Sequence, residues 1–452
     1  MKVLKFGGTS VGSEKSLANV KKIIEEIPGK ALIVVSALGG LTDKLISTSE
    51  MAAEGNPDWS KEMSDIKERH HRIIDNMVDH SKRDELYPEI DRLLDLLENK
   101  YEEVYKTKEL NEKSLDYIVS FGERLSSLIV AAMVKNGKRY YSPDFIKTEK
   151  WYGKNIISAK VTESLIKEKF ENLGEGEKCI IPGFISTDFH TGEITNLGRG
   201  GSDYTGALIA AALDAEVLEI WTDVDGFMTA DPRIVKDALI IDHLTFTESM
   251  ELCTFGAKVV YPPTIYPVFH KNIPIKILNT FNPTAPGTII TESHRPEDFD
   301  VKGVTSHNNL ALITIDVIER DSLLSMGRMI SDILSKNGVS IIPLENDYEK
   351  IHYGINESDV DKVTEILDTQ LQPYIEQRKI SIPQLQKNMA AIALVGRDMK
   401  NRGRLVARLK NSLEREGIGV MAIANMSSTT IIMMIEQESA SDALNIIHSL
   451  IY

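Results

Sequence analysis

Two kinds of hydrophobic spacing alternate at the start of the chain. Residues 3–6 and 31–35 are short and almost continuously apolar, whereas residues 14–27 place apolar side chains three or four positions apart. Continuous runs indicate strands buried on both faces, and the wider spacing indicates a helix with one buried face. Pro28 and Gly29 end the helical pattern. Strand, helix and strand in this order predict an α/β fold with a parallel sheet.

The α/β pattern continues to about residue 300. Strands are predicted at Cys179–Pro182, Glu216–Trp221 and Ile275–Leu278, and an apolar helix is predicted at Tyr204–Leu213. The polar, proline-containing stretch ESHRPEDFD then interrupts the pattern, so we expect a domain boundary near residue 300.

Residues 60–115 are highly charged but keep apolar side chains at helical spacing, which predicts two or three amphipathic helices. His70 and His71 are adjacent within this region. Neighbours on a helix point to different faces, so we interpret the pair as part of a solvated helix face and not as a metal site.

The pattern after residue 300 repeats itself. The stretch GRMISDILSKNGVSI at 327–341 is similar to GRLVARLKNSLEREGIGV at 403–420, and each lies between strand-like runs. Each half is predicted to be a βαββα(β) unit of the size of a small ligand-binding module. Such modules could instead serve only to stabilise a dimer. We expect domains at 1–300, 301–384 and 385–452.

Composition narrows the class of protein. The 452 residues are 42% hydrophobic and 26% charged, with a net charge of -15 and two cysteines, Cys179 and Cys253. These values predict a cytoplasmic globular protein with neither a transmembrane helix nor a disulfide framework. An acidic chain is not expected to bind nucleic acid, because phosphate backbones are bound by basic surfaces. Anionic small molecules remain possible ligands of a local basic cluster.

The first candidate site is KFGGTS, residues 5–10, where a strand runs into a glycine turn before a helix. Gly7 and Gly8 would let an anion approach backbone N–H groups at the helix N-terminus, and Lys5 would add a mobile charge. The lysine precedes the glycines, so the motif is not a P-loop. An ordinary turn is the alternative.

The second candidate is LGRGGSD, residues 197–203. Arg199 stands among Gly198, Gly200 and Gly201, and its planar guanidinium suits a carboxylate or a phosphate. Ser202 and Asp203 stand at a helix entrance, where the alternative role is an N-cap.

Three further segments carry candidate polar residues. WTDVDGFMTADPR at 221–233 follows a predicted strand and holds Asp223, Asp225 and Asp231, which could hold magnesium or a ribose, although composition alone favours turns. SALGGLTD at 36–43 offers Ser36 and Thr42. VSFGERLSS at 119–127 carries Glu123 at a helix start, where an ordinary solvated residue is the alternative.

Taken together, these segments and GAKVVYPPTI at 256–265 resemble the aspartokinases of the amino-acid kinase superfamily. The resemblance covers nearly the whole chain, because the two carboxyl-terminal units resemble the tandem ACT domains of that family. It implies an α/β fold: an amino-acid-kinase three-layer sandwich followed by two ferredoxin-like βαββαβ ACT domains.

The resemblance implies transfer of the γ-phosphoryl group of ATP, with Mg²⁺, to the side-chain carboxylate of L-aspartate. The product would be 4-phospho-L-aspartate, at the start of lysine, threonine and methionine synthesis. Feedback inhibition by lysine, threonine or both is expected through the ACT domains, as is a homodimer or homotetramer.

Site residues follow from the resemblance, position by position. Lys5 and Asp203 would be the catalytic pair. Aspartate would be bound by Ser36, Thr42, Glu123, Arg199 and Ser202. ATP would be bound by Lys5, Gly7, Gly8, Thr9, Ser10, Thr222, Asp223, Met228, Arg233, Lys258 and Val259. The effector would contact Ser325, Met326, Asn346, Asp347 and Asn425. No metal ligands are assigned among the protein side chains.

The chain departs from the family pattern at three places. Met228 stands where an aromatic residue is usual, and Tyr261 and Pro263 replace a histidine and an arginine. The stretch PLENDYEK at 343–350 replaces a Thr/Ser-rich effector segment, which leaves the effector open. The alternatives to an aspartokinase are a sister amino-acid kinase and a ligand sensor with an inactive kinase domain.

Overall fold

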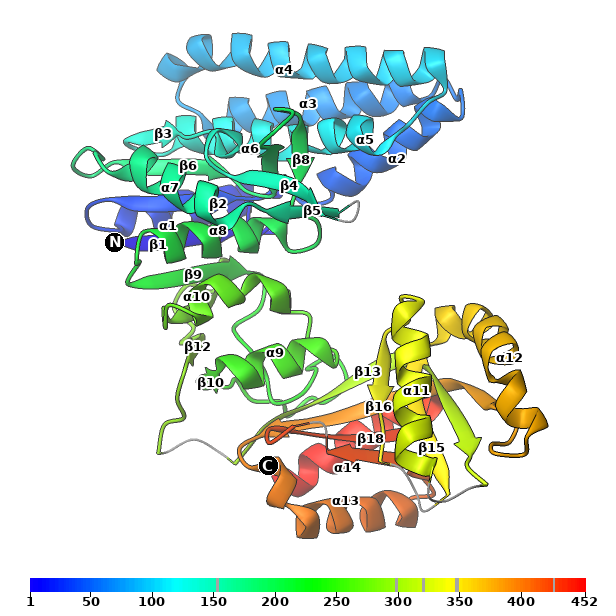
Figure 1. The fold of residues 1–452 in the computed structure, drawn as a ribbon. Coiled ribbons are helices and arrows are strands. Elements are labelled where there is room, and N and C mark those ends of the chain that lie inside the picture. Colours follow the sequence, from blue (N-terminus) through cyan, green and yellow to red (C-terminus); the bar gives the residue numbers. More distant parts are fainter. Residues whose placement is uncertain (152–153, 297–299, 319–321, 346–348, 426) are drawn as a thin grey trace. The chain divides into compact units, whose positions relative to one another are not determined.

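The computed structural model describes residues 1–452 except 152–153, 297–299, 319–321, 346–348 and 426 (Figure 1). The chain divides into two compact units. The first comprises residues 1–227 and 259–293, and the second comprises residues 228–258 and 294–452. Each unit is described by itself.

A mostly parallel sheet forms the centre of the first unit. Its strand order includes β12-β11-β9-β1-β2-β6-β3, with β12 antiparallel to β11. The strands are β1 (Lys2–Phe6), β2 (Ala31–Val35), β3 (Gly137–Arg139), β6 (Lys178–Pro182), β9 (Val217–Thr222), β11 (Ile275–Asn279) and β12 (Thr288–Thr291). The strands that the sequence predicts are therefore confirmed, and the continuous apolar runs are buried on both faces as expected.

Helices cover both faces of this sheet. The helices of the first unit are α1 (Glu14–Glu26), α2 (Leu41–Ala53), α3 (Trp59–Met77), α4 (His80–Thr107), α5 (Glu112–Val119), α6 (Phe121–Met133), α7 (Ala159–Phe170), α8 (Gly201–Ala212) and α10 (Tyr266–Phe269). Leu4 and Phe6 of β1 pack into a core with α1, α2, α3, α4 and α6. Successive strand residues point to opposite faces, so Lys5 lies on the other face, against α8.

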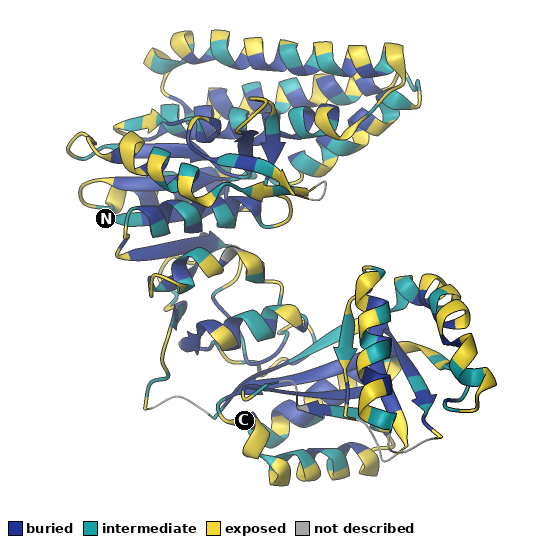
Figure 2. Ribbon diagram, viewed as in Figure 1, coloured by how far each residue is buried: buried dark blue, intermediate teal, exposed yellow. Residues whose placement is uncertain are grey.

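A small second sheet, of order β5-β4-β7-β8, completes the first unit. Its strands are β4 (Lys147–Trp151), β5 (Lys154–Ile157), β7 (Ile185–Asp188) and β8 (Ile194–Asn196). The burial pattern in Figure 2 agrees with this layering: the central strands are buried, and the outer side of α4 is exposed.

One expectation for the charged helices is wrong. His70 is completely buried in α3, and its Nδ1 lies 2.7 Å from the carbonyl oxygen of Ile66. Burial lowers the pKa of His70 to about 4, so the ring is neutral at pH 7. His71 does lie at the surface, where it pairs with Asp91 at 2.7 Å.

The second unit is built on one six-stranded sheet of order β14-β15-β13-β16-β18-β17. Its strands are β13 (Val301–Asp316), β14 (Ile341–Pro343), β15 (Lys350–Asn356), β16 (Gln384–Gly396), β17 (Ala422–Asn425) and β18 (Thr430–Glu436). The helices are α11 (Leu323–Lys336), α12 (Val360–Glu376), α13 (Gly403–Arg415) and α14 (Ala440–Ile451). Two cores, one with α11 and α12 and one with α13 and α14, correspond to two ferredoxin-like modules.

The two modules share their long strands. Residues 310–314 of β13 pair with β15 on one side and with residues 384–389 of β16 on the other. Residues 391–395 of β16 pair with β18 on one side and with residues 303–307 of β13 on the other. The first half of β13 is therefore the edge strand of the second module, and the first half of β16 is the edge strand of the first.

Residues 228–258 belong to the second unit and contribute β10 (His243–Thr245) and α9 (Phe246–Thr254). Glu251 of α9 accepts hydrogen bonds from the hydroxyls of Ser427 and Thr429, at 2.7 Å each, and from the hydroxyl of Thr430. Burial raises the pKa of Glu251 above its usual range, although the hydroxyls of Ser427 and Thr429 oppose the shift. We call this group the hydroxyl clasp.

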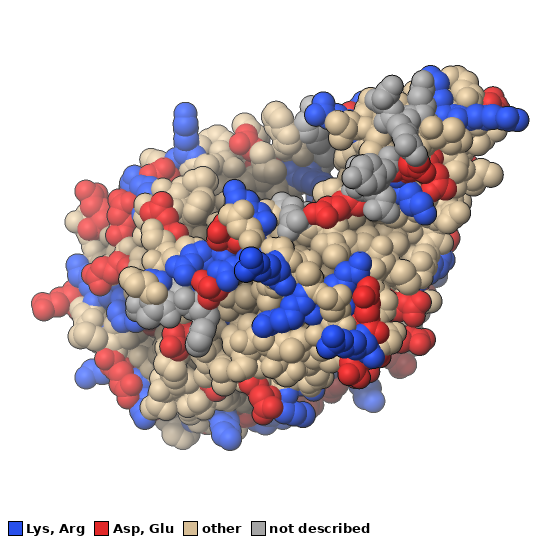
Figure 3. Space-filling model, turned by 90° about the horizontal axis from the view of Figure 1, so that it is seen from below, with Lys and Arg blue, Asp and Glu red and all other residues tan. Residues whose placement is uncertain are grey.

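Charges of both signs are interspersed on the face drawn in Figure 3, with uncharged surface between them. Among the described residues, no helix combines the length and apolar content needed to cross a bilayer.

Candidate active site

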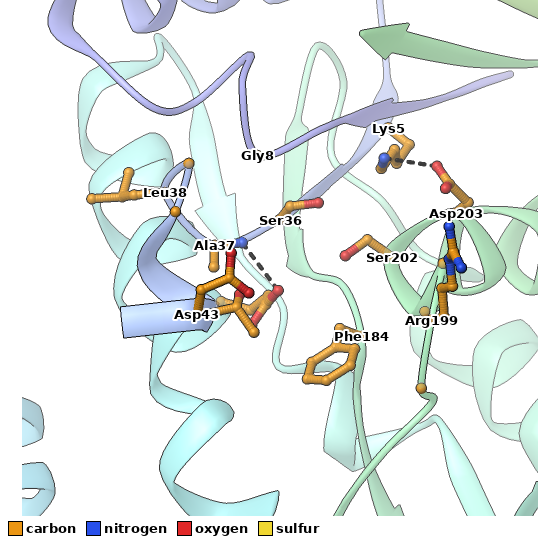
Figure 4. A pocket seen from close by; sticks show the side chains of 17 residues that line it. Lys5, Gly8, Ser36, Ala37, Leu38, Asp43, Phe184, Arg199, Ser202 and Asp203 are labelled. Atoms are coloured by element: carbon orange, nitrogen blue, oxygen red, sulfur yellow. Dashed lines mark hydrogen bonds and ion pairs between the residues drawn. The ribbon is translucent and has the colours of Figure 1, made fainter. Parts of the chain in front are cut away.

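A cavity of about 340 Å³ in the first unit gathers the predicted catalytic and substrate-binding residues. It is lined by the ends of β1 and β2, by the start of α2, by α6 and by the loop that begins α8 (Figure 4). The predicted residues found there are Lys5, Gly8, Ser36, Thr42, Glu123, Arg199, Ser202 and Asp203. Segments almost two hundred positions apart in sequence thus meet at the carboxyl ends of parallel strands, where α/β sheets bind ligands.

Lys5 and Asp203 form an ion pair in this cavity, with Nζ and Oδ1 2.7 Å apart (Figure 4). The sequence places the start of the helix at Tyr204, but α8 begins at Gly201 and its N-cap is Gly200, with φ of 69°. Ser202 and Asp203 therefore lie in the first helical turn and are not caps. The Asp203 carboxylate instead pairs with Lys5 and holds the lysine ammonium at the wall of the cavity.

Glu123 is completely enclosed, and only one of its oxygens has a partner. Oε1 accepts the backbone N–H of Ala37 at 3.0 Å, the bond drawn at Ala37 in Figure 4, whereas Oε2 is buried without a hydrogen bond. Burial raises the pKa of Glu123 to about 8, against the opposing effects of the Ala37 N–H and the Lys5 charge. An unpartnered buried oxygen on a cavity wall indicates a position for a ligand donor.

Two helix N-termini also face the cavity. Gly40, with φ of 74°, is the N-cap of α2, and Gly200 is the N-cap of α8. Because both caps are glycines, no cap side chain accepts the N–H groups of the first helical turns. N–H groups in the first turns, with the positive ends of both helix dipoles, make this part of the cavity suitable for anions.

Arg199 is an exposed residue of the cavity wall, and its guanidinium carbon lies 6.0 Å from the centre of the Tyr261 ring. The same tyrosine fills the space beside Gly200, where an added Cβ would lie 2.5 Å from the Tyr261 Cβ. Tyr261, one of the departures from the family pattern, therefore packs on the glycine loop that carries Arg199.

The predicted phosphate contacts are unevenly placed. Gly8 lines the cavity, Gly7 is buried next to Lys5, and Thr9 is exposed. Ser10 is fully buried, and its hydroxyl lies 2.7 Å from the Thr280 hydroxyl and 3.3 Å from the Trp221 carbonyl oxygen. The side chain of Ser10 thus supports the loop from behind.

The other predicted nucleotide residues fall in both units. Thr222, Asp223 and Val259 belong to the first unit, and Met228, Arg233 and Lys258 belong to the second. Arg233 forms an ion pair with Asp231 at 2.6 Å. Asp225 accepts hydrogen bonds from Asn279 and Asn282, which agrees with its interpretation as a turn residue.

The predicted effector residues are partly outside the described structure. Ser325 and Met326 lie in the first turns of α11. Asn346 and Asp347 are outside the described residues, and Asn425 ends β17, with its side chain outside the described part.

Several wall residues were not assigned from the sequence, and Asp43 and Phe184 are two of these with large side chains near the predicted residues. Asp43 ends the motif SALGGLTD, so its position in the first turn of α2 was a usable signal. Phe184 has a φ of 66°, and an added Cβ on Gly201 would lie 2.8 Å from its ring. No pattern in the sequence marks that conformation. Among the described residues, no three His, Cys, Asp or Glu side chains are grouped as a metal site requires.

Two protein-family models match parts of the chain. The model of the amino acid kinase family matches residues 1–279, and a model of the ACT domain matches residues 384–449. The chain belongs to the amino acid kinase family, and the predicted fold class is confirmed.

Aspartokinase 1 of Arabidopsis thaliana, a chloroplastic protein, is 30% identical over 453 residues, covering 97% of this chain and 78% of that protein. The bifunctional aspartokinase/homoserine dehydrogenase of Haemophilus influenzae is 30% identical over 464 residues, but this chain spans only 56% of its length. Within the amino acid kinases, the chain belongs with the aspartokinases.

Solved structures of aspartate kinases match the whole chain. The enzyme of Clostridium acetobutylicum matches with a TM-score of 0.82 and 27% identity, over 100% of both chains. Aspartokinase III of E. coli, in complex with aspartate and ADP, matches with a TM-score of 0.80 and 25% identity, over 99% of both chains. The same E. coli protein in complex with lysine and aspartate matches with a TM-score of 0.75.

Proposed function

We propose that this protein is an aspartokinase that transfers the γ-phosphoryl group of ATP to the side-chain carboxylate of L-aspartate. The observation that carries the proposal is the cavity, where an ion-paired lysine, an arginine and an unpartnered buried glutamate oxygen lie together. An amino acid with a second carboxylate has two carboxylates for the lysine side and the arginine, and an ammonium for the glutamate oxygen. The aspartate complex of E. coli aspartokinase III supports the choice of substrate.

The chemistry needs positioning more than proton transfer. The attacking carboxylate of aspartate is already ionised at pH 7, so no general base is required. Lys5 would neutralise negative charge on the transferring phosphoryl group, and Asp203 would hold the ammonium in place through the 2.7 Å ion pair. The first-turn N–H groups of α2 and α8 would receive the remaining anionic oxygens.

The substrate ammonium would be bound by Glu123 and the α-carboxylate by Arg199. Bringing an ammonium to the free Oε2 of Glu123 would lower the pKa of that carboxyl group from about 8 and favour its ionised form. Ser36, Thr42 and Ser202, which also line the cavity, would complete the aspartate pocket.

ATP would bind with Mg²⁺, which neutralises charge on the β- and γ-phosphates. The donors present fit a magnesium ion carried by the nucleotide, since Mg²⁺ is usually held by phosphates with few protein carboxylates. Gly7, Gly8 and Thr9 would bind the phosphates, and Ser10 would support their loop from behind. The rest of the nucleotide would be bound by Thr222, Asp223, Met228, Arg233, Lys258 and Val259.

We propose that the second unit binds an end-product amino acid, lysine first and threonine second, and pairs with other copies to form a dimer or tetramer. The lysine complex of E. coli aspartokinase III supports the choice of effector. Ser325, Met326, Asn346, Asp347 and Asn425 would contact it.

A hydroxamate assay tests the proposed reaction, because hydroxylamine traps an acyl phosphate. Purified protein is incubated with ATP, Mg²⁺ and either L-aspartate or L-glutamate. Product from aspartate alone is expected. Product from glutamate would favour a sister kinase, and product from neither would favour the inactive sensor.

A further inference from the structure

Arg69 of α3 joins the two glycine loops that form the cavity, although it does not line the cavity itself. Its Nη2 donates one hydrogen bond to the carbonyl oxygen of Gly12 and one to that of Gly39, both at 2.9 Å. Gly12 ends the loop that follows β1, and Gly39 lies in the loop that follows β2. One nitrogen of one side chain therefore bridges the proposed phosphate loop and the proposed aspartate loop.

The two loops are packed backbone to backbone at this point. A Cβ added to Gly39 would lie 3.0 Å from the carbonyl oxygen of Gly8, and one added to Gly12 would lie 3.3 Å from the Gly39 nitrogen. Both Gly8 and Gly39 line the cavity. A shift of one loop against the other would therefore change the distance between the two reactants.

Helix α3 is well placed to hold this bridge. Lys44 of α2 pairs with Glu62 and Asp65 of α3, at 2.8 and 3.2 Å. Helix α1, which follows the other glycine loop, packs against α3 in the same apolar core. Each glycine loop thus leads into a helix that is held by α3. Arg69 is half-buried, and among the described residues it forms no ion pair, so its guanidinium is committed to the two carbonyl groups.

We propose that Arg69 is a positioning residue for phosphoryl transfer, which holds the ATP side of the cavity at a fixed distance from the aspartate side. This rests on the proposed function. Misplacing reactants by about 1 Å can reduce a rate about 100-fold. Arginine is suited to the task because its planar fork presents N–H donors in fixed directions, which the flexible ammonium of lysine does not.

The test compares Arg69→Met with Arg69→Lys and with Arg72→Met as a matched control. Arg69→Met is expected to lower kcat about 50-fold, with at most a threefold change in KM for aspartate. Arg69→Lys should recover part of kcat. A further variant, Arg69→Ala, tests chemical rescue. Millimolar guanidinium should partly restore its kcat, because the free ion can occupy the position of the missing Arg69 guanidinium. Arg72→Met should keep the wild-type kcat, since it removes only an exposed ion pair.

Amide hydrogen exchange gives a second reading that does not depend on turnover. In Arg69→Met, residues 7–12 and 36–40 should exchange at least tenfold faster, while β1 and β2 keep their protection. Unchanged exchange, or a kcat equal to that of Arg72→Met, would overturn the proposal. If the wild type forms no aspartyl hydroxamate but the exchange result holds, the proposed function fails and the role of Arg69 as a loop clamp stands.

Discussion

Glu123 in the first unit is buried and Glu251 in the second is half-buried, and burial raises the pKa of both. Their surroundings differ. Glu251 receives three hydroxyl donors in the hydroxyl clasp, so its acceptors are satisfied within the fold. Glu123 receives one backbone N–H and keeps an oxygen without a partner on the wall of a cavity.

The difference teaches how to separate a structural carboxylate from a ligand-binding one. Burying a carboxylate costs free energy unless its oxygens accept hydrogen bonds. A carboxylate with protein donors to its oxygens stabilises the fold, whereas one that lacks a donor can gain a hydrogen bond from a ligand. By this criterion the cavity beside Glu123 is the candidate binding site of the first unit, and the clasp is a structural contact between α9 and the start of β18. The predictions below test that distinction.

The largest effect is expected at Lys5, which shares the cavity with Glu123. Lys5→Ala should lower kcat about 10³-fold, because a charge aimed at the transferring phosphoryl group is lost. Steady-state kinetics measure the loss, and circular dichroism should show an unchanged fold. Near-normal turnover would remove the open-site interpretation of the cavity.

Glu123→Gln should raise the KM for aspartate about 30-fold, the loss of one charge-assisted bond of about 2 kcal/mol. With a pKa of about 8, the wild-type carboxyl becomes ionised between pH 7 and pH 9. The wild-type KM should therefore fall about tenfold over that interval, and the Gln variant should lose this dependence.

Glu123→Gln should also change how the free energy of unfolding depends on pH. The folded state holds the Glu123 proton up to about pH 8, whereas the unfolded state releases it near the ordinary glutamate pKa of 4.5. Stability from this group is therefore complete below the unfolded pKa and declines as pH rises toward 8. Urea unfolding should show Glu123→Gln gaining stability relative to wild type from pH 5 to pH 8. A constant difference would contradict this.

Glu251→Ala should affect stability and leave substrate binding almost unchanged, the opposite of what is expected for the KM of Glu123→Gln. Loss of an acceptor shared by three hydroxyls should reduce the free energy of unfolding by about 2 kcal/mol, while the KM for aspartate changes less than twofold. Urea unfolding and the hydroxamate assay measure the two effects on the same preparation. A large KM change with full stability would make the clasp part of a binding site.

The smallest effect concerns the effector. Lysine or threonine at ten times its Kd should stabilise the protein by about 1.4 kcal/mol in the absence of ATP, because it binds only the folded state. A thermal-shift titration identifies which one binds. No shift with either amino acid, beside a clear shift with aspartate, would limit ligand binding to the first unit.

Much of the first unit could be predicted from sequence, because its signals are local. Apolar runs mark the buried strands, and glycines mark the loops at their ends. The structure brings Lys5, Ser36 and Asp203 from three of these loops to one cavity. His70 was misjudged although a signal existed. It follows Ile66 by four positions and precedes Ile74 by four, on the buried stripe of α3.

Other features had no local signal. Glu251 and Thr430 are 179 positions apart, and nothing near either residue announces the other. Arg69 has the same appearance in the sequence as the exposed Arg72. The start of α8 was placed three residues late, since glycines usually weaken a helix but here open one. Tertiary packing decides such cases.

The strand exchange within the second unit affects how this protein is made. The first half of β13 leaves the ribosome long before β16 and β18, the partners that complete its module. Until then, residues 301–307 are a strand without its pairing partner, and unpaired strands are a known route to misassociation. The first module can close once β16 appears, but the second must wait for the final stretch of the chain. Any division of the gene between the two modules would cut through this exchange, so the pair should be inherited, transplanted and expressed as one piece.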